Sequence, residues 1–285
     1  MTGKSITGIF DLNFLNECKT PMYSGANSLG FQLQLKKSES IYLKFSKIPE
    51  EFSLIKSQDQ LRKICSFRSD LVIPFLDICL LENPFYFSGH YYNLVTLHPF
   101  KKIKPIGFYE EFSSIYQTLI NYWILKGFND LHCADILHGD VNIQNIGFAT
   151  FLSKTIPIIF DINIYQITST NKKEIFISPE FMAPEVFQFG NYDLKSELWA
   201  MGVLLFTIHT KEFPFGLRSG NSKAKNIFLN MSQKNIERIV EKSPQSIKKI
   251  VKGLLKLNPT ERISTGECLE LIKKETKWFI RPFLN

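Results

Sequence analysis

The alternation of apolar and polar residues predicts that the first part of the chain is rich in β-strands. Residues 31–35 (FQLQL) alternate strictly and residues 41–45 (IYLKF) follow a polar turn, so both are expected to be half-buried strands. Residues 71–81 and 91–97 are expected to be further strands, separated by the turn-forming segments ENP and SGH. Residues 49–66 have a mixed pattern and are expected to form a helix.

The rest of the chain has the periodicity of helices. Apolar side chains recur every three or four positions through residues 108–132, which predicts a long amphipathic helix. Residues 196–210 are almost entirely apolar, which predicts a buried helix. Residues 246–257 and 265–274 are expected to form two more amphipathic helices.

These two patterns together predict an α+β protein with two lobes. The small, β-rich lobe is expected to cover residues 1–98 and the larger, helical lobe residues 99–285, with the hinge near residues 98–102. A length of 285 residues allows one large domain or two joined lobes. A hydrophobic content of 44% supplies enough apolar material for a sizeable core.

Composition and charge narrow the possible functions. The net charge is +7, but the lysines are scattered, which favours a solvated basic surface over a nucleic-acid-binding one. The five cysteines lack the spacing of metal ligands and indicate reduced thiols in a cytoplasmic protein. Neither a signal-peptide pattern nor an apolar run of membrane-spanning length is present. The chain is therefore expected to be soluble, with no membrane or nucleic-acid partner.

The segment LHGDVNIQN, residues 137–145, contains the strongest candidate chemistry. Asp140 and Asn145 place a carboxylate and an amide oxygen five positions apart, and Asp161 follows the apolar run IPIIF. Hard cations such as Mg²⁺ prefer oxygen ligands of this kind. Phosphoryl transfer needs such metal ligands, a carboxylate that orients the attacking hydroxyl, and a lysine on the phosphates. The segment therefore indicates a phosphoryl-transfer site.

Five motifs, in order along the chain, resemble those of the protein kinase family. HGDVNIQN resembles the catalytic loop HRDLKPEN, and DIN at residues 161–163 resembles DFG. The other three, which resemble the family's APE segment, central helix and terminal segment, are ISPEFMAPE (177–185), SELWAMG (196–202) and LLKLNPTERIS (254–264). The resemblance covers about residues 20–280 and implies a two-lobed protein-kinase-like fold.

The resemblance implies roles for individual residues. Asp140 would be the catalytic carboxylate that receives the substrate hydroxyl, and Asn145 and Asp161 would hold Mg²⁺, with Mn²⁺ as an alternative. Lys44 would contact the α- and β-phosphates of ATP. Ser178 stands where serine/threonine kinases have a threonine that bonds the catalytic Asp, which favours Ser/Thr hydroxyls of protein substrates as acceptors.

The resemblance also implies a nucleotide site in the first lobe, with residues 23–30 covering the phosphates. The implied ATP-binding residues are Gly25, Ala26, Asn27, Ser28, Gly30, Lys44, Glu51, Val95 and Leu97. Glu51 is preferred as the acid that pairs with Lys44, although Asp59 or Gln60 fits the family's spacing better. In the second lobe, Arg262 is expected to pair with Glu185.

Several departures from the family pattern bear on activity. Gly139 replaces the Arg that meets a phosphate on the activation loop, so activity is expected to be independent of activation-loop phosphorylation. Asn142, assigned to the catalytic group, replaces the Lys that contacts the γ-phosphate, so transfer is expected to be slower. Tyr42 replaces the Ala that lines the adenine pocket and is expected to crowd the base. Glu197 replaces the Asp that braces the catalytic loop.

Three functions remain open from the sequence. A serine/threonine protein kinase is favoured, because the groups at the metal and base positions are all present. A pseudokinase that acts as a binding module is the alternative, supported by Tyr42 and Asn142. A small-molecule phosphotransferase of the aminoglycoside type also carries HGD, but that group lacks the segments that ISPEFMAPE and SELWAMG resemble. The Ile-, Phe-, Lys- and Asn-rich composition would also suit a viral or bacterial kinase acting in a host cell.

Overall fold

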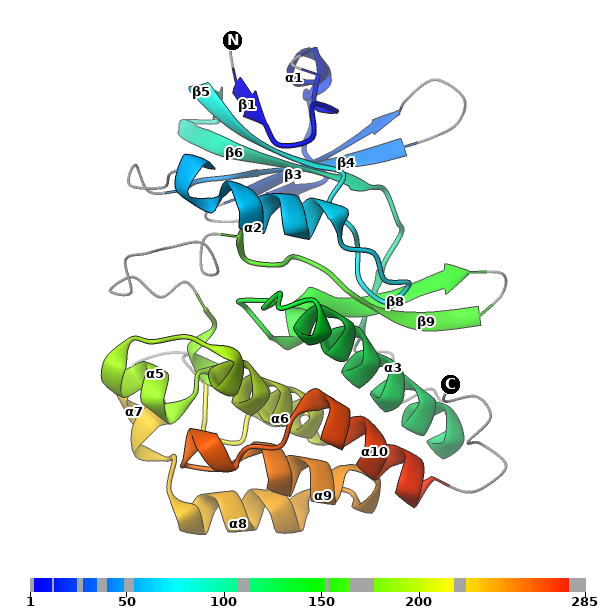
Figure 1. Cartoon of the computed structure of the whole chain (residues 1–285), viewed down its shortest axis with the longest axis vertical. Helices are drawn as coiled ribbons and strands as arrows, with labels where there is room; N and C mark the ends of the chain where they lie inside the picture. Colours follow the sequence, from blue (N-terminus) through cyan, green and yellow to red (C-terminus); the bar gives the residue numbers. More distant parts are fainter. Residues whose placement is uncertain are drawn as a thin grey trace. The chain divides into compact units, whose positions relative to one another are not determined.

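The chain forms two compact units in a computed structural model, Met1–Lys102 and Ile103–Asn285 (Figure 1). The structure describes residues 3–11, 13–24, 28–34, 40–48, 54–106, 113–151, 154–164, 177–217 and 224–276. The first unit is built mainly from strands and the second mainly from helices, so the predicted α+β class is confirmed. Within these described ranges, no helix has the length and apolar character that a membrane span requires.

One antiparallel sheet of six strands dominates the first unit, with the strand order β1-β5-β6-β4-β3-β2. Its strands are β1 (Gly3–Ser5), β2 (Tyr23–Ser24), β3 (Ser28–Gln34), β4 (Ser40–Ser46), β5 (Asp77–Phe87) and β6 (His90–Pro99). The helices of this unit are α1 (Phe14–Glu17) and α2 (Leu54–Ser66). The predicted strands near residues 31–35, 41–45 and 91–97 and the helix within 49–66 are therefore confirmed.

The prediction of a strand over residues 71–81 followed by a turn at ENP was wrong. The strand β5 begins only at Asp77 and continues through this segment to Phe87. Its register with β6 shifts between Leu80 and Phe85, which is the mark of a bulge or similar irregularity. Pro84 has no N–H to donate, and the strand accommodates it where the regular pairing is interrupted.

The two faces of this sheet differ in character. One face is a core of apolar side chains, none of them more than 4% exposed: Leu29, Phe31, Leu33, Leu43, Phe45, Val95 and Leu97. Lys44 and Tyr42 alternate with these residues along β4, so their side chains point to the other face. The strand register places Lys44 beside Gly30 on β3 and beside Thr96 on β6.

A buried carboxylate fixes the N-terminal segment to this sheet. Asp77 is 0% exposed, and its two carboxylate oxygens accept hydrogen bonds from the main-chain N–H groups of Ile6 (3.1 Å), Thr7 (2.9 Å), Ile9 (3.0 Å) and Phe10 (2.8 Å) and from the Ser5 hydroxyl. Burial alone would raise the pKa of Asp77, but hydrogen bonds from Ser5, Thr7, Phe10 and Ile78 hold that pKa below its ordinary value. The segment before residue 20 is thus part of the first unit.

The second unit contains the helices α3 (Ser114–Cys133), α5 (Pro184–Phe189), α6 (Leu194–Thr210), α7 (Ala224–Leu229), α8 (Gln233–Lys242), α9 (Gln245–Leu254) and α10 (Thr265–Glu275). Short 3₁₀ turns are η3 (Ile143–Asn145), η4 (Pro179–Phe181) and η5 (Pro259–Glu261). A three-stranded sheet comprises β7 (Lys104–Pro105), β8 (Ile146–Phe151) and β9 (Lys154–Ile159). The helices predicted from periodicity are confirmed in the described residues, although residues 108–112 of the first one lie outside them. The elements α5, α7, α8, β7 and β8 were not predicted.

The helix α6 is the centre of the second unit. It starts at a capping box formed by Asp193 and Ser196, and every residue from Ser196 to Ile208 is buried. Trp199 on this helix stacks on Phe215, with ring centroids 5.3 Å apart. α6 packs against α9 and lies close to η3, η4 and η5. A charged residue on this helix, such as Glu197, is therefore surrounded by protein and must be stabilised by protein groups.

We expect Asp77→Asn to lower the free energy of unfolding by about 3 kcal/mol at pH 7, because it leaves several N–H groups without a charged acceptor. A carboxyl group with a depressed folded-state pKa stabilises the fold above its unfolded pKa of about 3.9, and that contribution is lost as the pH falls through the folded pKa. Urea denaturation at several pH values should therefore show the difference from wild type shrinking below about pH 4. Asp70→Asn, at an exposed position of the same unit, serves as the control. An equal difference at pH 7 and pH 2 would contradict this account.

Candidate active site

The loop between α3 and η3 presents Asp140 with both carboxylate oxygens engaged. One oxygen, Oδ1, accepts hydrogen bonds from the main-chain N–H of Ser178 (3.2 Å) and from its hydroxyl (3.4 Å). The other, Oδ2, accepts from the side-chain amide of Asn145 at 3.1 Å. Asp140 is half-buried. The structure thus brings together Asp140, Asn145 and Ser178, which were all predicted to belong to the site.

Three hydrogen bonds connect this loop to the segment that carries Asp161. The Phe160 N–H donates to the carbonyl of Asn145 at 3.0 Å, and the Asn163 N–H donates to the carbonyl of His138 at 2.7 Å. The His138 ring nitrogen Nε2 lies 2.9 Å from the Phe160 carbonyl. Because these bonds bracket Asp161 on both sides, its main chain is held beside the Asp140 loop.

The backbone at Asp161 adopts a conformation that is uncommon for a residue with a side chain. Its φ is 67°, in the left-handed region. Residues other than glycine cost free energy there and persist only where their surroundings fix them, which is frequent at functional sites. Gly139 also has a positive φ, 80°, and glycine takes up this conformation without strain. The replacement of an Arg by Gly139 therefore suits the local backbone as well as removing a charge.

A buried carboxylate on α6 holds the Asp140 loop from behind. Glu197 is 0% exposed and accepts hydrogen bonds from the main-chain N–H groups of His138 (2.9 and 3.0 Å) and Gly139 (3.0 Å). It also accepts one from the Tyr192 hydroxyl at 2.8 Å, and lies 2.8 Å from Nε2 of His132. The expected bracing role of Glu197 thus rests on five contacts.

The electrostatics of this cluster favour an ionised Glu197. Burial alone would raise the pKa of Glu197, but the hydrogen bond and charge of His132, the charge of His138 and the Gly139 N–H lower it below its ordinary value. Burial and the adjacent Glu197 raise the pKa of Tyr192 well above its ordinary value, so the phenol stays protonated and donates. Neither His132 nor Tyr192 was predicted to belong to the site. The sequence feature that could have indicated His132 is its position as a single histidine at the end of a largely apolar helical stretch.

The predicted metal ligands have the chemistry that Mg²⁺ requires. The amide nitrogen of Asn145 donates to Asp140, both to its carboxylate and to its carbonyl (2.9 Å), so the amide oxygen faces the other way. That oxygen and the Asp161 carboxylate are hard oxygen donors, and Mg²⁺ is commonly held by one or two protein carboxylates together with water and phosphate oxygens. Among the residues described, no group of three or more His, Cys, Asp and Glu side chains has metal-binding geometry. A site of this composition fits Mg²⁺.

The side chain of Asn142 is used within the loop itself. Its amide oxygen accepts hydrogen bonds from the N–H groups of Gln144 (2.8 Å) and Asn145 (3.2 Å) and so caps η3. Its amide nitrogen donates to the carbonyl of Asp140 at 3.2 Å. Asn142 is 4% exposed. These contacts leave it little freedom to reach a phosphate, which was the role of the lysine that it replaces in the family pattern.

The predicted nucleotide residues of the first unit are only partly described. Ser28 and Gly30 lie on β3 and Lys44 on β4, while Gly25, Ala26, Asn27 and Glu51 lie outside the described residues. Asp59, the alternative partner for Lys44, is an exposed residue of α2. The side chains of Val95 and Leu97 are 1% and 2% exposed in the core on the face opposite Lys44. Only their main chain is available to a ligand on the Lys44 face.

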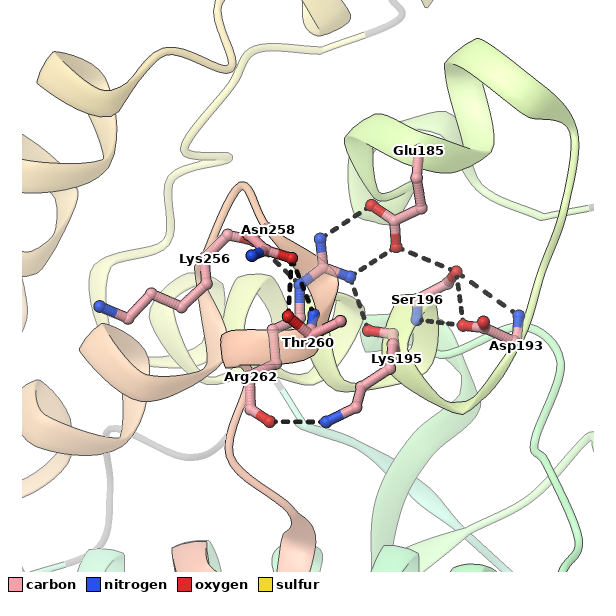
Figure 2. A network of polar contacts seen from close by, with 8 residues as sticks. All are labelled: Glu185, Asp193, Lys195, Ser196, Lys256, Asn258, Thr260 and Arg262. Atoms are coloured by element: carbon pink, nitrogen blue, oxygen red, sulfur yellow. Dashed lines mark hydrogen bonds and ion pairs between the residues drawn. The ribbon is translucent and has the colours of Figure 1, made fainter.

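The predicted ion pair between Arg262 and Glu185 is confirmed. Two guanidinium nitrogens of Arg262 contact the two carboxylate oxygens of Glu185 at 2.5 and 2.8 Å (Figure 2). The same guanidinium donates to the carbonyls of Lys195 (2.7 Å) and Lys256 (3.0 Å), and it lies 5.1 Å from the centre of the Trp199 ring. The Arg262 side chain is 0% exposed and that of Glu185 is 17% exposed, so this largely buried bidentate pair joins the segment after Ser178 to α6 and η5.

Comparison with known proteins gives consistent results. Residues 33–275 match the model of a family described as "Protein kinase domain". Serine/threonine-protein kinase 17A of Oryctolagus cuniculus is 31% identical over 156 residues, which cover 52% of this chain and 37% of the relative. Serine/threonine-protein kinase ATG1 of Debaryomyces hansenii is 29% identical over 180 residues, or 60% and 20% of the two chains. The matched region thus spans much less than half the length of these relatives.

We expect Arg262→Met to lower the free energy of unfolding by about 3–5 kcal/mol, because it leaves Glu185 and two carbonyls without their charged donor. The matched control is Lys242→Met, which breaks the exposed ion pair with Glu212 and should cost less than about 1 kcal/mol. Denaturant titration of both variants measures the difference. Similar small losses in the two variants would show that the buried pair is dispensable for stability.

Proposed function

Because the chain belongs to the protein kinase family, we propose that it is a serine/threonine protein kinase, which transfers the γ-phosphate of ATP to Ser or Thr hydroxyls of protein substrates. Family membership confirms the resemblance that the five motifs indicated. The observation that best supports activity is the arrangement around Asp140, because Asn145 and the Asp161 segment are bonded to the same loop. The names of the two relatives and the contact of Ser178 with Asp140 support Ser/Thr acceptors.

In the proposed reaction, the acceptor oxygen forms a bond to the γ-phosphorus as the bond to the β,γ-bridging oxygen breaks and ADP leaves. Asp140 orients the acceptor hydroxyl and receives its proton, while its contacts with Ser178 and Asn145 keep the carboxylate in place. Asn145 and Asp161 would hold Mg²⁺, which when bound neutralises phosphate charge. Lys44 would contact the α- and β-phosphates of ATP.

We also propose that activity does not depend on phosphorylation of the segment between Asp161 and Glu185. Gly139 has no side chain that could bind a phosphate, and the positive φ at this position suits glycine. Residues 165–176 of that segment lie outside the described residues. The proposal therefore rests on Gly139.

Further parts of the proposal concern organisation and setting. We propose a single kinase domain over about residues 20–280, with an N-lobe of residues 1–98 and a C-lobe of residues 99–285. Protein substrates and ATP are the proposed partners. The proposed location is the cytoplasm, with the five unpaired cysteines as its support.

We expect Asp140→Asn to reduce phosphate transfer roughly 10²- to 10⁴-fold, because the variant cannot accept the hydroxyl proton. The measurement is the transfer of labelled γ-phosphate from ATP with Mg²⁺ or Mn²⁺ to the chain itself and to generic protein substrates. The control is Asp135→Asn, an exposed position of the same loop with a φ of 46° that Asn tolerates, and it should retain activity. Transfer that persists in Asp140→Asn would remove Asp140 from the proposed mechanism.

A second candidate function, a binding module without turnover, is favoured by Tyr42. This side chain shares the Lys44 face of the sheet and packs so closely on Gly30 that a methyl group at residue 30 would overlap the tyrosine hydroxyl. Gly30 is the neighbour of Lys44 across β3 and β4. A nucleotide bound on this face would therefore meet the Tyr42 ring.

If the chain is an active kinase, Tyr42→Ala should bind ATP more tightly, by roughly tenfold, because the ring no longer has to leave Gly30 before the nucleotide binds. Isothermal titration with ATP and Mg²⁺ measures the affinity, and Tyr91→Ala, at a 65% exposed tyrosine of the same sheet, is the control. Absence of nucleotide binding in wild type together with clear binding in Tyr42→Ala would support the binding-module function. Absence of binding in both proteins would argue against any nucleotide site on this face.

A further inference from the structure

We propose that Asn142 is a positioning residue, which fixes the distance between Asp140 and Asn145 by capping the η3 turn between them. This inference rests on the proposed function and refines it, because it replaces the phosphate contact expected at this position with a structural task inside the loop. The residue at this position in the family pattern is a lysine, and a lysine side chain has three donors and no acceptor. It therefore could not form the cap that Asn142 provides.

The contacts of Asn142 form a closed set with the two residues that it separates. Asn142 accepts from the Asn145 N–H with its amide oxygen (3.2 Å) and donates to the Asp140 carbonyl with its amide nitrogen (3.2 Å). The side-chain amide of Asn145 donates to the same Asp140 carbonyl at 2.9 Å. Each of the three residues is thus bonded directly to the other two. Loss of the Asn142 amide would remove both of its side-chain bonds in this set and leave, between Asn142 and Asn145, the main-chain bond from the Asn145 N–H to the Asn142 carbonyl (3.3 Å).

The consequence for the reaction is that the polar groups of Asp140 and Asn145 are held in position before a substrate binds. The orientation of the Asn145 side chain decides which way its amide oxygen points, and the Asn142 cap fixes the main chain from which that side chain extends. Residues that orient metal ligands commonly change metal affinity or activity by roughly 10- to 100-fold when they are removed. Asn142 is also buried, at 4% exposed, so a long charged side chain would have to leave the loop.

The chain offers a close match for a control. Asn258 caps the η5 turn in the same way, since its amide oxygen accepts from the N–H of Thr260 at 3.1 Å and from its hydroxyl at 2.9 Å. Asn258 is exposed and belongs to the segment before Arg262, so it takes no part in the Asp140 loop. A cap that only stabilises its own turn should behave alike at the two positions.

The test compares Asn142→Ala, Asn142→Ser, Asn142→Lys and Asn258→Ala in the full chain. We expect Asn142→Ala to lower kcat roughly 10- to 100-fold and to raise the Mg²⁺ concentration for half-maximal activity, with a smaller change in the KM for ATP. Asn142→Ser keeps an effective capping acceptor and should recover part of that loss. Asn142→Lys should lose as much as Asn142→Ala. Asn258→Ala should leave kcat and the Mg²⁺ dependence within about twofold of wild type.

Two results would overturn the inference while leaving the proposed kinase function intact. One is an active Asn142→Lys with kcat equal to or above that of wild type. The other is an Asn142→Ala whose kcat and Mg²⁺ dependence change no more than those of Asn258→Ala.

Hydrogen exchange provides a measurement that does not depend on activity. Asn142→Ala should raise exchange at the amides of Gln144 and Asn145, just as Asn258→Ala raises exchange at the Thr260 amide. If wild type transfers no phosphate, the kinase proposal fails, and this measurement still decides whether Asn142 orders the loop. Unchanged exchange at both amides in Asn142→Ala would overturn the inference.

Discussion

The carboxylate of Glu197 is the point on which the candidate active site depends. It is fully buried in α6, yet it is ionised, because it accepts hydrogen bonds from two main-chain N–H groups and the Tyr192 hydroxyl and lies against His132. A buried charge of this kind is tolerated only when its surroundings satisfy it completely. The loop that carries Asp140 supplies two of those donors. The loop conformation and the burial of Glu197 therefore require each other.

Hydrogen bonds to main-chain groups connect this loop to the segment that carries Asp161 and to the segment that begins at Ser178. His138 bonds to the carbonyl of Phe160, and the N–H groups of Phe160 and Asn163 donate back to the loop. Asp161 lies within this bracket and is held at a positive φ that its side chain would not favour by itself. On the other side, Ser178 reaches Asp140, and the chain then continues to Glu185, which Arg262 fixes to α6 and η5. The buried ion pair thus anchors the segment that begins at Ser178.

The site has fewer positive charges than the family pattern would give it. Gly139 and Asn142 stand where an arginine and a lysine are usual, and both replacements fit the local backbone. Gly139 matches a positive φ, and Asn142 caps a turn that a lysine could not cap. The two replacements remove positive charge from the loop, and both residues suit the conformation of its main chain. This arrangement of the loop supports the proposal that activity does not depend on a phosphorylated activation segment.

The sequence alone determined the fold class, most of the helices and strands, and the set of residues around Asp140. Periodicity located α6 and α3. The resemblance of five short motifs to those of the protein kinase family implied Asp140, Asn145, Asp161, Ser178 and the Arg262–Glu185 pair. The tertiary structure decided what depends on contacts between distant residues. Asp77 gathers the N–H groups of residues 6–10, and His132 and Tyr192 meet at Glu197, although nothing local marks these residues as partners. The pattern of a single strand does not determine its register with its neighbours. In the structure, this register places the side chains of Val95 and Leu97 in the core and those of Lys44 and Tyr42 on the opposite face.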